Sequence, residues 1–243
     1  MAFFVTPLRA YSLVANNAYK WETGQTLKVL FLDGNMAEQK AVISAFKVWL
    51  NYINLNVEYY TEANKDEFYD IRVTVKPNFD SSRIGKEAHQ IAQDQPTLTL
   101  GSAKILSAYF DTTNAKKKEA QGTLLHEVAH ALAFQHEHQH PNFPYEWKRQ
   151  FIEEVCINRL VRAYKKIKTD KSPAEIEQTI EDSCDRDFSK FTPEEVTASD
   201  IFDERSIMTY EAPSSAFING AGIDRHNKLS AADREWAAKI YPF

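Results

Sequence analysis

The 243-residue sequence is poor in cysteine and contains no long apolar run. Two cysteines are too few for a disulfide-rich scaffold, so the fold must depend on a hydrophobic core, which the 43% of hydrophobic residues can supply. No apolar segment approaches the roughly 20 residues of a membrane span. The net charge of −5 gives no reason to expect nucleic acid or an anionic membrane surface as a partner. We therefore expect one domain, or two close-packed subdomains, acting as a monomer.

A recognisable secretion signal is also missing. The first apolar stretch is interrupted by Pro7 and Arg9, and no basic segment precedes it. We expect either that the chain is not exported by this route or that a leader and propeptide are missing from the sequence. The N-terminal residues therefore do not indicate where the protein is located.

The most informative segment that is present reads HEVAHALAFQH and contains His126, Glu127, His130 and His136. Residues four apart lie on one face of a helix, so the imidazoles of His126 and His130 can bind one metal ion. If the helix continued, His136 would lie roughly 9 Å beyond His130 along the axis. Zinc–nitrogen bonds are only about 2 Å long, so the chain must turn sharply before His136. This pattern predicts a zinc site with three histidines and an open fourth position.

Two alternatives remain open for this segment. The first is an ordinary amphipathic helix with exposed histidines and a solvated Glu127. The second concerns the third ligand, because His136 and His138 point to the same side of an extended segment, which makes His138 a rival. The spacing favours His136. Neither His89 nor His226 is assigned a role.

A second motif lies far downstream, at residues 206–210 (Ser-Ile-Met-Thr-Tyr). Together, the two motifs resemble the metzincin clan of zinc metalloproteases, whose pattern is HExxHxxGxxH followed by a methionine turn, and most closely its astacin-like branch, whose turn reads SxMxY. The resemblance implies that His126, His130 and His136 are the zinc ligands. It further implies that Glu127 is the general base, that Met208 forms the hydrophobic floor of the site, and that Tyr210 reaches the metal or the oxyanion of the reaction.

Weaker likenesses extend this resemblance over most of the chain from Trp21 to Pro242. They are the continuation HEHQHPN (136–142), the strand and loop DIRVTVKPNFDSSRIG (70–85), the edge strand PTLTLG (96–101) and the closing helix LSAADREWAAKIYP (229–242). The implied fold is α+β and metzincin-like. A twisted mixed sheet with long helices forms an upper subdomain, and a lower subdomain is rich in helices and loops. The active-site cleft lies between them.

The sequence departs from the clan at three points. Ala133 stands where the clan has a glycine of positive φ, and alanine there costs about 1 kcal/mol more; we predict that the turn still forms with strained or adjusted geometry. The long gap between His136 and Met208 implies an inserted helical segment. The position of Glu137 is tied to a mature N-terminus in astacin-like enzymes, whereas here we expect a structural anion with a local partner.

Periodicity gives the expected elements. We expect an irregular arm at 1–20, strands at 26–32, 55–60, 70–76 and 95–100, and helices at 36–53, 120–134 and 145–167. A short helix should begin after Ser172, and a last helix after Ser230 with Asp233 at its third position. The single catalytic domain 1–243 would divide into an upper subdomain at 21–136 and a lower one at 137–243. A disulfide between Cys156 and Cys184 and two buried thiols remain equally open.

The function that follows is that of a zinc metalloendopeptidase, which hydrolyses peptide bonds with one catalytic zinc ion and Glu127 as general base. The partner would be a protein or peptide substrate, aligned by pairing with an edge strand at 97–100. Secretion is suggested by the family resemblance alone. Two alternatives are a binding or effector protein stabilised by zinc without turnover, and a zinc hydrolase of a non-peptide amide.

Overall fold

The computed structural model describes residues 13–76, 79–106, 114–166 and 172–243. Its larger sheet has five strands in the order β3-β2-β4-β6-β5. The strands are β2 (Thr26–Phe31), β3 (Asn56–Tyr60), β4 (Ile71–Thr74), β5 (Asp80–Ser82) and β6 (Leu98–Leu100). β5 is antiparallel to its neighbour and the other pairs are parallel. All four residues of β4 are buried, as expected for a central parallel strand.

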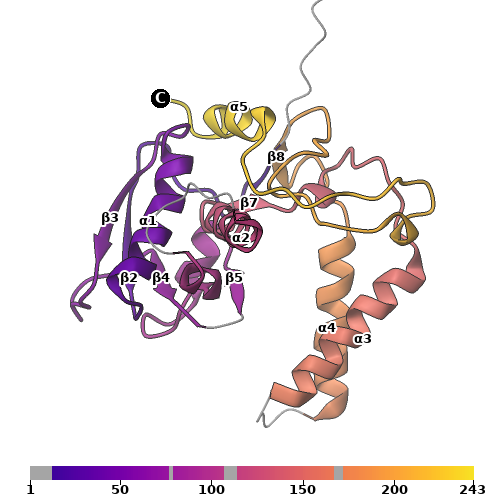
Figure 1. Ribbon diagram of the computed structural model, residues 1–243, viewed down its shortest axis with the longest axis horizontal. Coiled ribbons are helices and arrows are strands. Elements are labelled where there is room, and N and C mark those ends of the chain that lie inside the picture. Colours follow the sequence, from indigo (N-terminus) through magenta and orange to yellow (C-terminus); the bar gives the residue numbers. More distant parts are fainter. Residues whose placement is uncertain (1–12, 77–78, 107–113, 167–171) are drawn as a thin grey trace, which may run out of the picture.

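Two long helices pack beside this sheet, as Figure 1 shows. They are α1 (Met36–Leu50) and α2 (Ala115–Ala131). Trp49 of α1 is fully buried, and its indole N–H donates to the carbonyl of Leu125 in α2 at 3.0 Å. The apolar spacing that predicted α1 therefore describes the face that the helix buries against α2 and the core. The predicted helices at 36–53 and 120–134 are confirmed, although both end three residues earlier than predicted and α2 also starts earlier.

A second, three-stranded sheet has the order β7-β1-β8. Its central strand is β1 (Val14–Asn16), flanked by β7 (Phe134–Gln135) and β8 (Val196–Ala198). The prediction of an irregular arm at 1–20 is therefore wrong at β1, and residues 1–12 lie outside the described residues. Three residues are too few to show an alternating pattern, and their order comes from pairing with strands distant in sequence.

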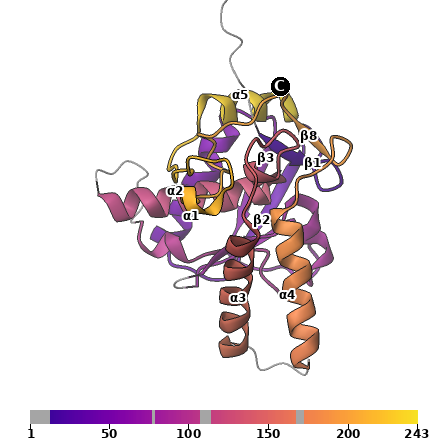
Figure 2. The same ribbon diagram turned by 90° about the vertical axis from the view of Figure 1, so that its right-hand side faces the viewer.

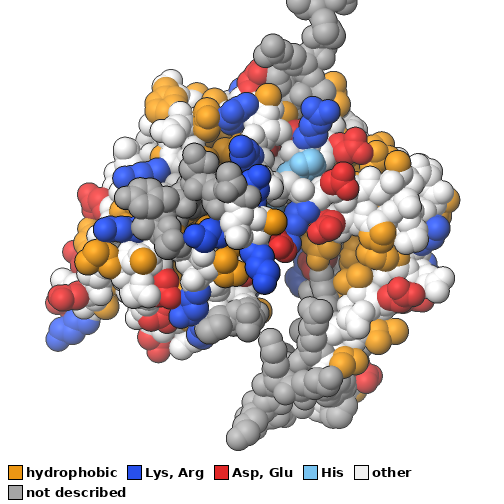
Figure 3. All heavy atoms as spheres, in the orientation of Figure 1, with side chains coloured by type: hydrophobic (Ala, Val, Ile, Leu, Met, Phe, Trp, Pro, Cys, Tyr) orange, Lys and Arg blue, Asp and Glu red, His pale blue; other side chains and the backbone are white. Residues whose placement is uncertain are grey.

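The inserted segment after His136 is a helical hairpin that projects from the rest of the molecule (Figures 1 and 2). It consists of α3 (Arg149–Lys166) and α4 (Pro173–Phe188), joined by a disulfide between Cys156 and Cys184. Ser172 caps α4 in a capping box with Glu175, as predicted, although the helix is longer than expected. Ile157 of α3 is 57% exposed, and Figure 3 shows further hydrophobic side chains on this part of the surface.

The last helix, α5 (Ala231–Ile240), begins at a capping box formed by Ser230 and Asp233, as predicted. Four short 3₁₀ helices complete the described structure: η1 (Gly85–Gln90), η2 (Gly101–Lys104), η3 (Glu137–Gln139) and η4 (Ser214–Ala216). Among the described residues, no helix is long and apolar enough to cross a membrane. The division into subdomains at residue 136 stays a prediction.

The predicted edge strand at 95–100 lies inside the sheet. The segment at 95–100 forms β6, but β6 is not an edge strand, because β5 pairs with it from Asp80 to Ser82. Within the described residues, β5 ends the sheet. The hypothesis that 97–100 aligns substrate by strand addition is therefore wrong, because both sides of β6 are occupied.

The turn after α2 forms despite its alanine. Ala133 has a φ of +74° and is the one non-glycine residue with positive φ in the described chain. Its N–H donates to the carbonyl of His130 at 2.8 Å, which closes the helix end. The adjusted geometry that we predicted is confirmed. Gly85 packs closely against this turn, because a Cβ added at Gly85 would lie 2.6 Å from the Ala133 methyl.

Replacing Ala133 with glycine should stabilise the protein. Glycine adopts positive φ without the steric cost of a Cβ, so we expect the free energy of unfolding to rise by about 1 kcal/mol. Chemical denaturation measures this difference. Ala131→Gly is the matched control, because Ala131 has ordinary helical geometry and glycine there should cost about 1 kcal/mol. Equal destabilisation by both substitutions would show that Ala133 carries no backbone strain.

Candidate metal centre

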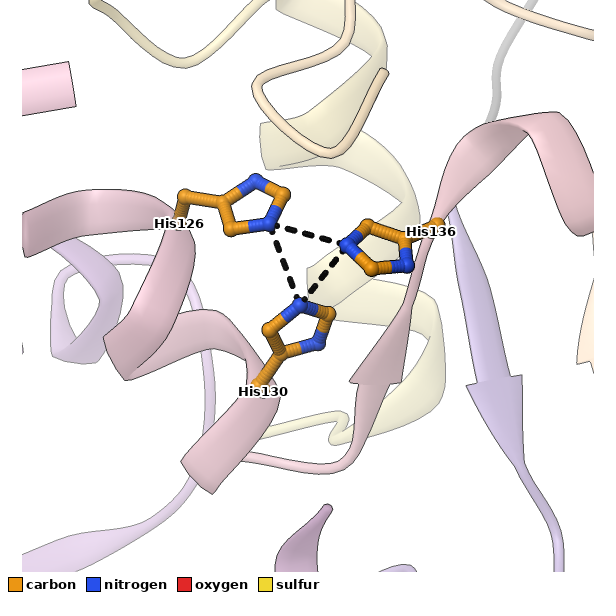
Figure 4. Close-up of side chains that lie close together, drawn as sticks. All are labelled: His126, His130 and His136. Carbon is orange, nitrogen blue, oxygen red and sulfur yellow. Dashed lines mark hydrogen bonds between the residues drawn. The ribbon is translucent and has the colours of Figure 1, made fainter. Parts of the chain in front are cut away.

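Three histidine side chains converge at the end of α2. His126 and His130 extend from successive turns of the helix, and His136 follows β7 after the sharp turn (Figure 4). The Nε2 atoms are 3.1 Å apart between His126 and His130, 3.1 Å between His126 and His136, and 3.2 Å between His130 and His136. Three ligands on a tetrahedral zinc ion, with bonds of about 2.05 Å, would be about 3.3 Å apart. The donor set therefore fits zinc.

The hydrogen bonds on the far sides of the rings support this interpretation. His126 donates from Nδ1 to the carbonyl of Ile207 at 2.9 Å, and His130 donates from Nδ1 to the carbonyl of Phe134 at 2.7 Å. In neutral imidazoles, these bonds leave the Nε2 atoms as unprotonated acceptors. Two lone pairs facing each other at 3.1 Å repel unless a cation lies between them. The arrangement therefore suits the binding of a metal ion.

The protonation state of the histidines suits ligation. Burial, followed by the nearby His126, lowers the pKa of His130 to about 3. Burial is also the main cause of the lowered pKa of His126. Both imidazoles are therefore neutral near pH 7, as metal ligands must be.

Glu127 follows His126 in α2 and lines a cavity of about 310 Å³, together with His126, Tyr210 and Arg225. Burial, reinforced by the carboxylate of Asp80 in β5, raises the pKa of Glu127 to about 8, while Arg225 acts in the opposite direction. A cation at the histidines would also favour the ionised carboxylate. A carboxyl group with these neighbours is suited to accepting and releasing a proton.

The segment 206–210 is held in place by the last helix. Asp233 of α5 accepts hydrogen bonds from the Ser206 hydroxyl at 2.6 Å and from the N–H of Ile207 at 2.9 Å. The carbonyl of the same Ile207 orients His126. Met208 is fully buried in the main core. The sequence indicates only the helix-capping role of Asp233, because its contact with residues 206–207 joins segments that are distant along the chain.

Tyr210 reaches the cavity from the end of this segment. Its ring centroid is 5.4 Å from that of His136, with the planes at 85°. All five residues that the sequence singled out as ligands or catalytic groups are thus brought to one place: His126, His130, His136, Glu127 and Tyr210. Their roles stay predictions.

His138 and Glu137, the two nearest neighbours of His136 that the sequence analysis discussed, have partners outside the histidine cluster. In the described part of the chain, the one group of three side chains that could hold a metal consists of His126, His130 and His136. The rival His138 instead directs its Nε2 to the carbonyl of Asp187, at 2.7 Å. Glu137 has the expected local partner, the N–H of Asp203. However, burial raises the pKa of Glu137 well above its usual value, which favours a neutral acid over the predicted anion.

Comparison with solved structures identifies the fold. A structure of myroilysin superposes with a TM-score of 0.71 and 24% sequence identity, covering 95% of this chain and 98% of that one. This chain has the fold of myroilysin. A crystal structure of myroilysin gives a TM-score of 0.62 at 24% identity, over 93% of this chain and 87% of that one. The predicted α+β, metzincin-like architecture is confirmed at the level of the fold.

A weaker similarity links the chain to high choriolytic enzyme 1, a hatching enzyme zinc-protease from the medaka fish Oryzias latipes. Its TM-score is 0.48 at 16% identity, over 92% of this chain and 94% of that one. No protein-family model and no curated protein matches the sequence. Because the myroilysin fold does not by itself determine chemistry, function must be argued from the site.

Proposed function

We propose that this protein is a zinc-dependent endopeptidase that hydrolyses protein or peptide substrates. The observation that carries the proposal is the convergence of three histidine Nε2 atoms within 3.2 Å of one another, with Glu127 and His126 lining the same cavity. The myroilysin-like fold agrees with it. When bound, zinc lowers the pKa of a coordinated water toward 7 and polarises the substrate carbonyl.

Glu127 would act as the general base. Its carboxylate would accept a proton from the attacking water and then deliver it to the leaving amine. Burial raises the pKa of Glu127, and a cation at the adjacent histidines would oppose that rise and favour the carboxylate that accepts the proton. Tyr210 would donate a hydrogen bond from its phenol to the oxyanion that develops on the substrate.

An extended substrate would be aligned by β5 rather than by β6. Within the described residues, β5 is the last strand of the five-stranded sheet. It is also close to the site, because the carboxylate of Asp80 acts on Glu127. Main-chain hydrogen bonds to this edge would place a peptide in the cleft that we propose between residues 21–136 and 137–243.

The alternative of a purely structural zinc has less support. Structural zinc sites hold four protein ligands, whereas the described residues offer three. One of the three, His126, lines a cavity that leaves room for water and substrate. A zinc hydrolase of a non-peptide amide would use the same groups and differs only in its substrate.

Casein hydrolysis tests the proposal directly. The zinc-loaded protein should cleave casein, a chelator such as 1,10-phenanthroline should abolish cleavage, and added zinc should restore it. Cleavage that persists in the chelator, after metal analysis confirms zinc removal, would exclude zinc catalysis. A zinc-loaded protein that leaves casein and a peptide library intact would favour one of the two alternative functions.

Replacing Tyr210 with phenylalanine should lower turnover more than substrate binding. The ring and its packing against His136 are retained, and only the phenol hydrogen bond to the oxyanion is lost. Removing one oxyanion donor costs about 10²-fold to 10³-fold in kcat at most, and KM should change little. Steady-state kinetics on one peptide gives both values. An undiminished kcat would remove Tyr210 from the mechanism.

A further inference from the structure

We propose that His138 is a positioning residue that links the α3–α4 hairpin to the metal centre and fixes the relative orientation of His136 and Tyr210. This inference rests on the proposed function, because it assigns to His138 a role in the same site. His138 is 1% exposed and is not among the three convergent ligands.

The ring of His138 touches both groups that it would position. It stacks on His136 with centroids 5.1 Å apart and planes at 23°. It meets Tyr210 nearly edge-on, at 5.1 Å and 79°. Aromatic rings 5 to 6 Å apart resist independent rotation in a packed interior. His136 and Tyr210 therefore share one rigid neighbour in addition to their own contact.

The ring is anchored at its other end on α4. Nε2 of His138 donates to the carbonyl of Asp187 at 2.7 Å, and the adjacent Gln139 donates from its side-chain amide to the carbonyl of Arg186 at 3.0 Å. Both carbonyls belong to the last turn of α4, where main-chain acceptors lack helical partners. Two consecutive side chains thus cap the helix and fix η3 against it.

The hairpin is itself held together near this anchor. The disulfide joins Cys184 in the same helix to Cys156 of α3. Phe188 and Trp147 pack around the ring of His138, at 6.1 and 5.7 Å. The path from hairpin to metal centre is therefore continuous: disulfide, end of α4, His138, and then His136 and Tyr210. Outer contacts of this kind orient ligands and tune metal sites.

His140 provides a matched control. It is the same residue type two positions later, and it is fully buried. Its ring contacts the N–H of Asn142 and the hydroxyl of Ser199 instead of the metal centre. His138→Gln retains an N–H donor for Asp187 and removes the ring, and His140→Asn retains an acceptor for Asn142 and removes the ring. Both variants are made in the wild-type chain and in Tyr210→Phe.

Kinetics of the zinc-loaded proteins on one peptide is the first readout. We expect His138→Gln to lower kcat about tenfold, in the range found for outer contacts of metal ligands, while KM changes less than about twofold. Because part of this loss acts through Tyr210, the same substitution in Tyr210→Phe should cost about threefold or less. His140→Asn should leave kcat within about twofold of the wild type.

Absorption spectra of the cobalt-substituted proteins are the second readout and do not depend on activity. The visible bands of cobalt report ligand geometry, so His138→Gln should shift them and His140→Asn should not. If His138→Gln fails to fold, His138→Phe keeps an aromatic ring and removes the anchor to Asp187, and the same readouts apply.

Equal losses from His138→Gln and His140→Asn, an identical cost in both Tyr210 backgrounds, or an unshifted cobalt spectrum would each overturn the inference. A wild-type protein that binds zinc and cleaves nothing would instead refute the proposed function. The cobalt comparison would then still decide whether His138 orients His136.

Discussion

Glu127→Gln should abolish most peptide cleavage while leaving the bound zinc in place. Glutamine keeps the size of the side chain but cannot accept the proton from water, so we expect kcat/KM to fall by about 10²-fold to 10⁴-fold. In the proposed site the histidines hold the metal, so zinc content should remain one ion per chain. Peptide hydrolysis and elemental analysis of the same sample measure the two quantities.

The control for this variant is Glu235→Gln. Glu235 lies on α5 in a surface pair with Lys239, and its loss should leave hydrolysis unchanged. Undiminished cleavage by Glu127→Gln would mean that another group accepts the proton. Loss of zinc together with activity would mean that Glu127 acts through the metal site instead of as a base.

His130→Ala should remove the metal from the folded protein. In the proposed site His130 supplies one of three ligands, and among the described residues no replacement lies within reach of the other two Nε2 atoms. We expect the apparent zinc affinity to fall on the order of a thousandfold, since each ligand carries a large share of the binding free energy. Competition with a chromophoric chelator measures this affinity.

His140→Asn is again the comparison, because it removes a buried histidine outside the cluster. Its zinc affinity should match that of the wild type. Circular dichroism of both variants without metal separates a lost ligand from a lost fold. If His130→Ala retained wild-type affinity, the proposed centre would be wrong, because no three-histidine site would remain.

The part of the site that was predictable from sequence follows from helix geometry. The spacing of His126 and His130 places them on one face, and bond lengths require a turn before His136. The turn forms at Ala133 with the positive φ that the position demands. The spacing also favoured His136 over His138, and the structure brings His136 to the cluster.

The elements that were missed are short and depend on distant partners. β1 and β5 have three residues each, so no periodicity marks them. The pairing of β5 with β6 decides which strand lies at the edge of the five-stranded sheet. The neutral state favoured for Glu137 results from complete burial, which no neighbour in sequence indicates. The hydrogen bonds from Ser206 and Ile207 to Asp233 likewise join segments that only the tertiary fold brings together.

The three-stranded sheet has a consequence for folding kinetics. β7 immediately precedes His136, and it pairs with β1, which also pairs with β8. The segment that carries His136 is thus held by pairing between strands that are far apart in sequence. Such contacts are slow to form because their loop-closure entropy must first be overcome. During refolding, α1 and α2 can form early, whereas competence to capture the metal should arise late, once β1 and β8 have met.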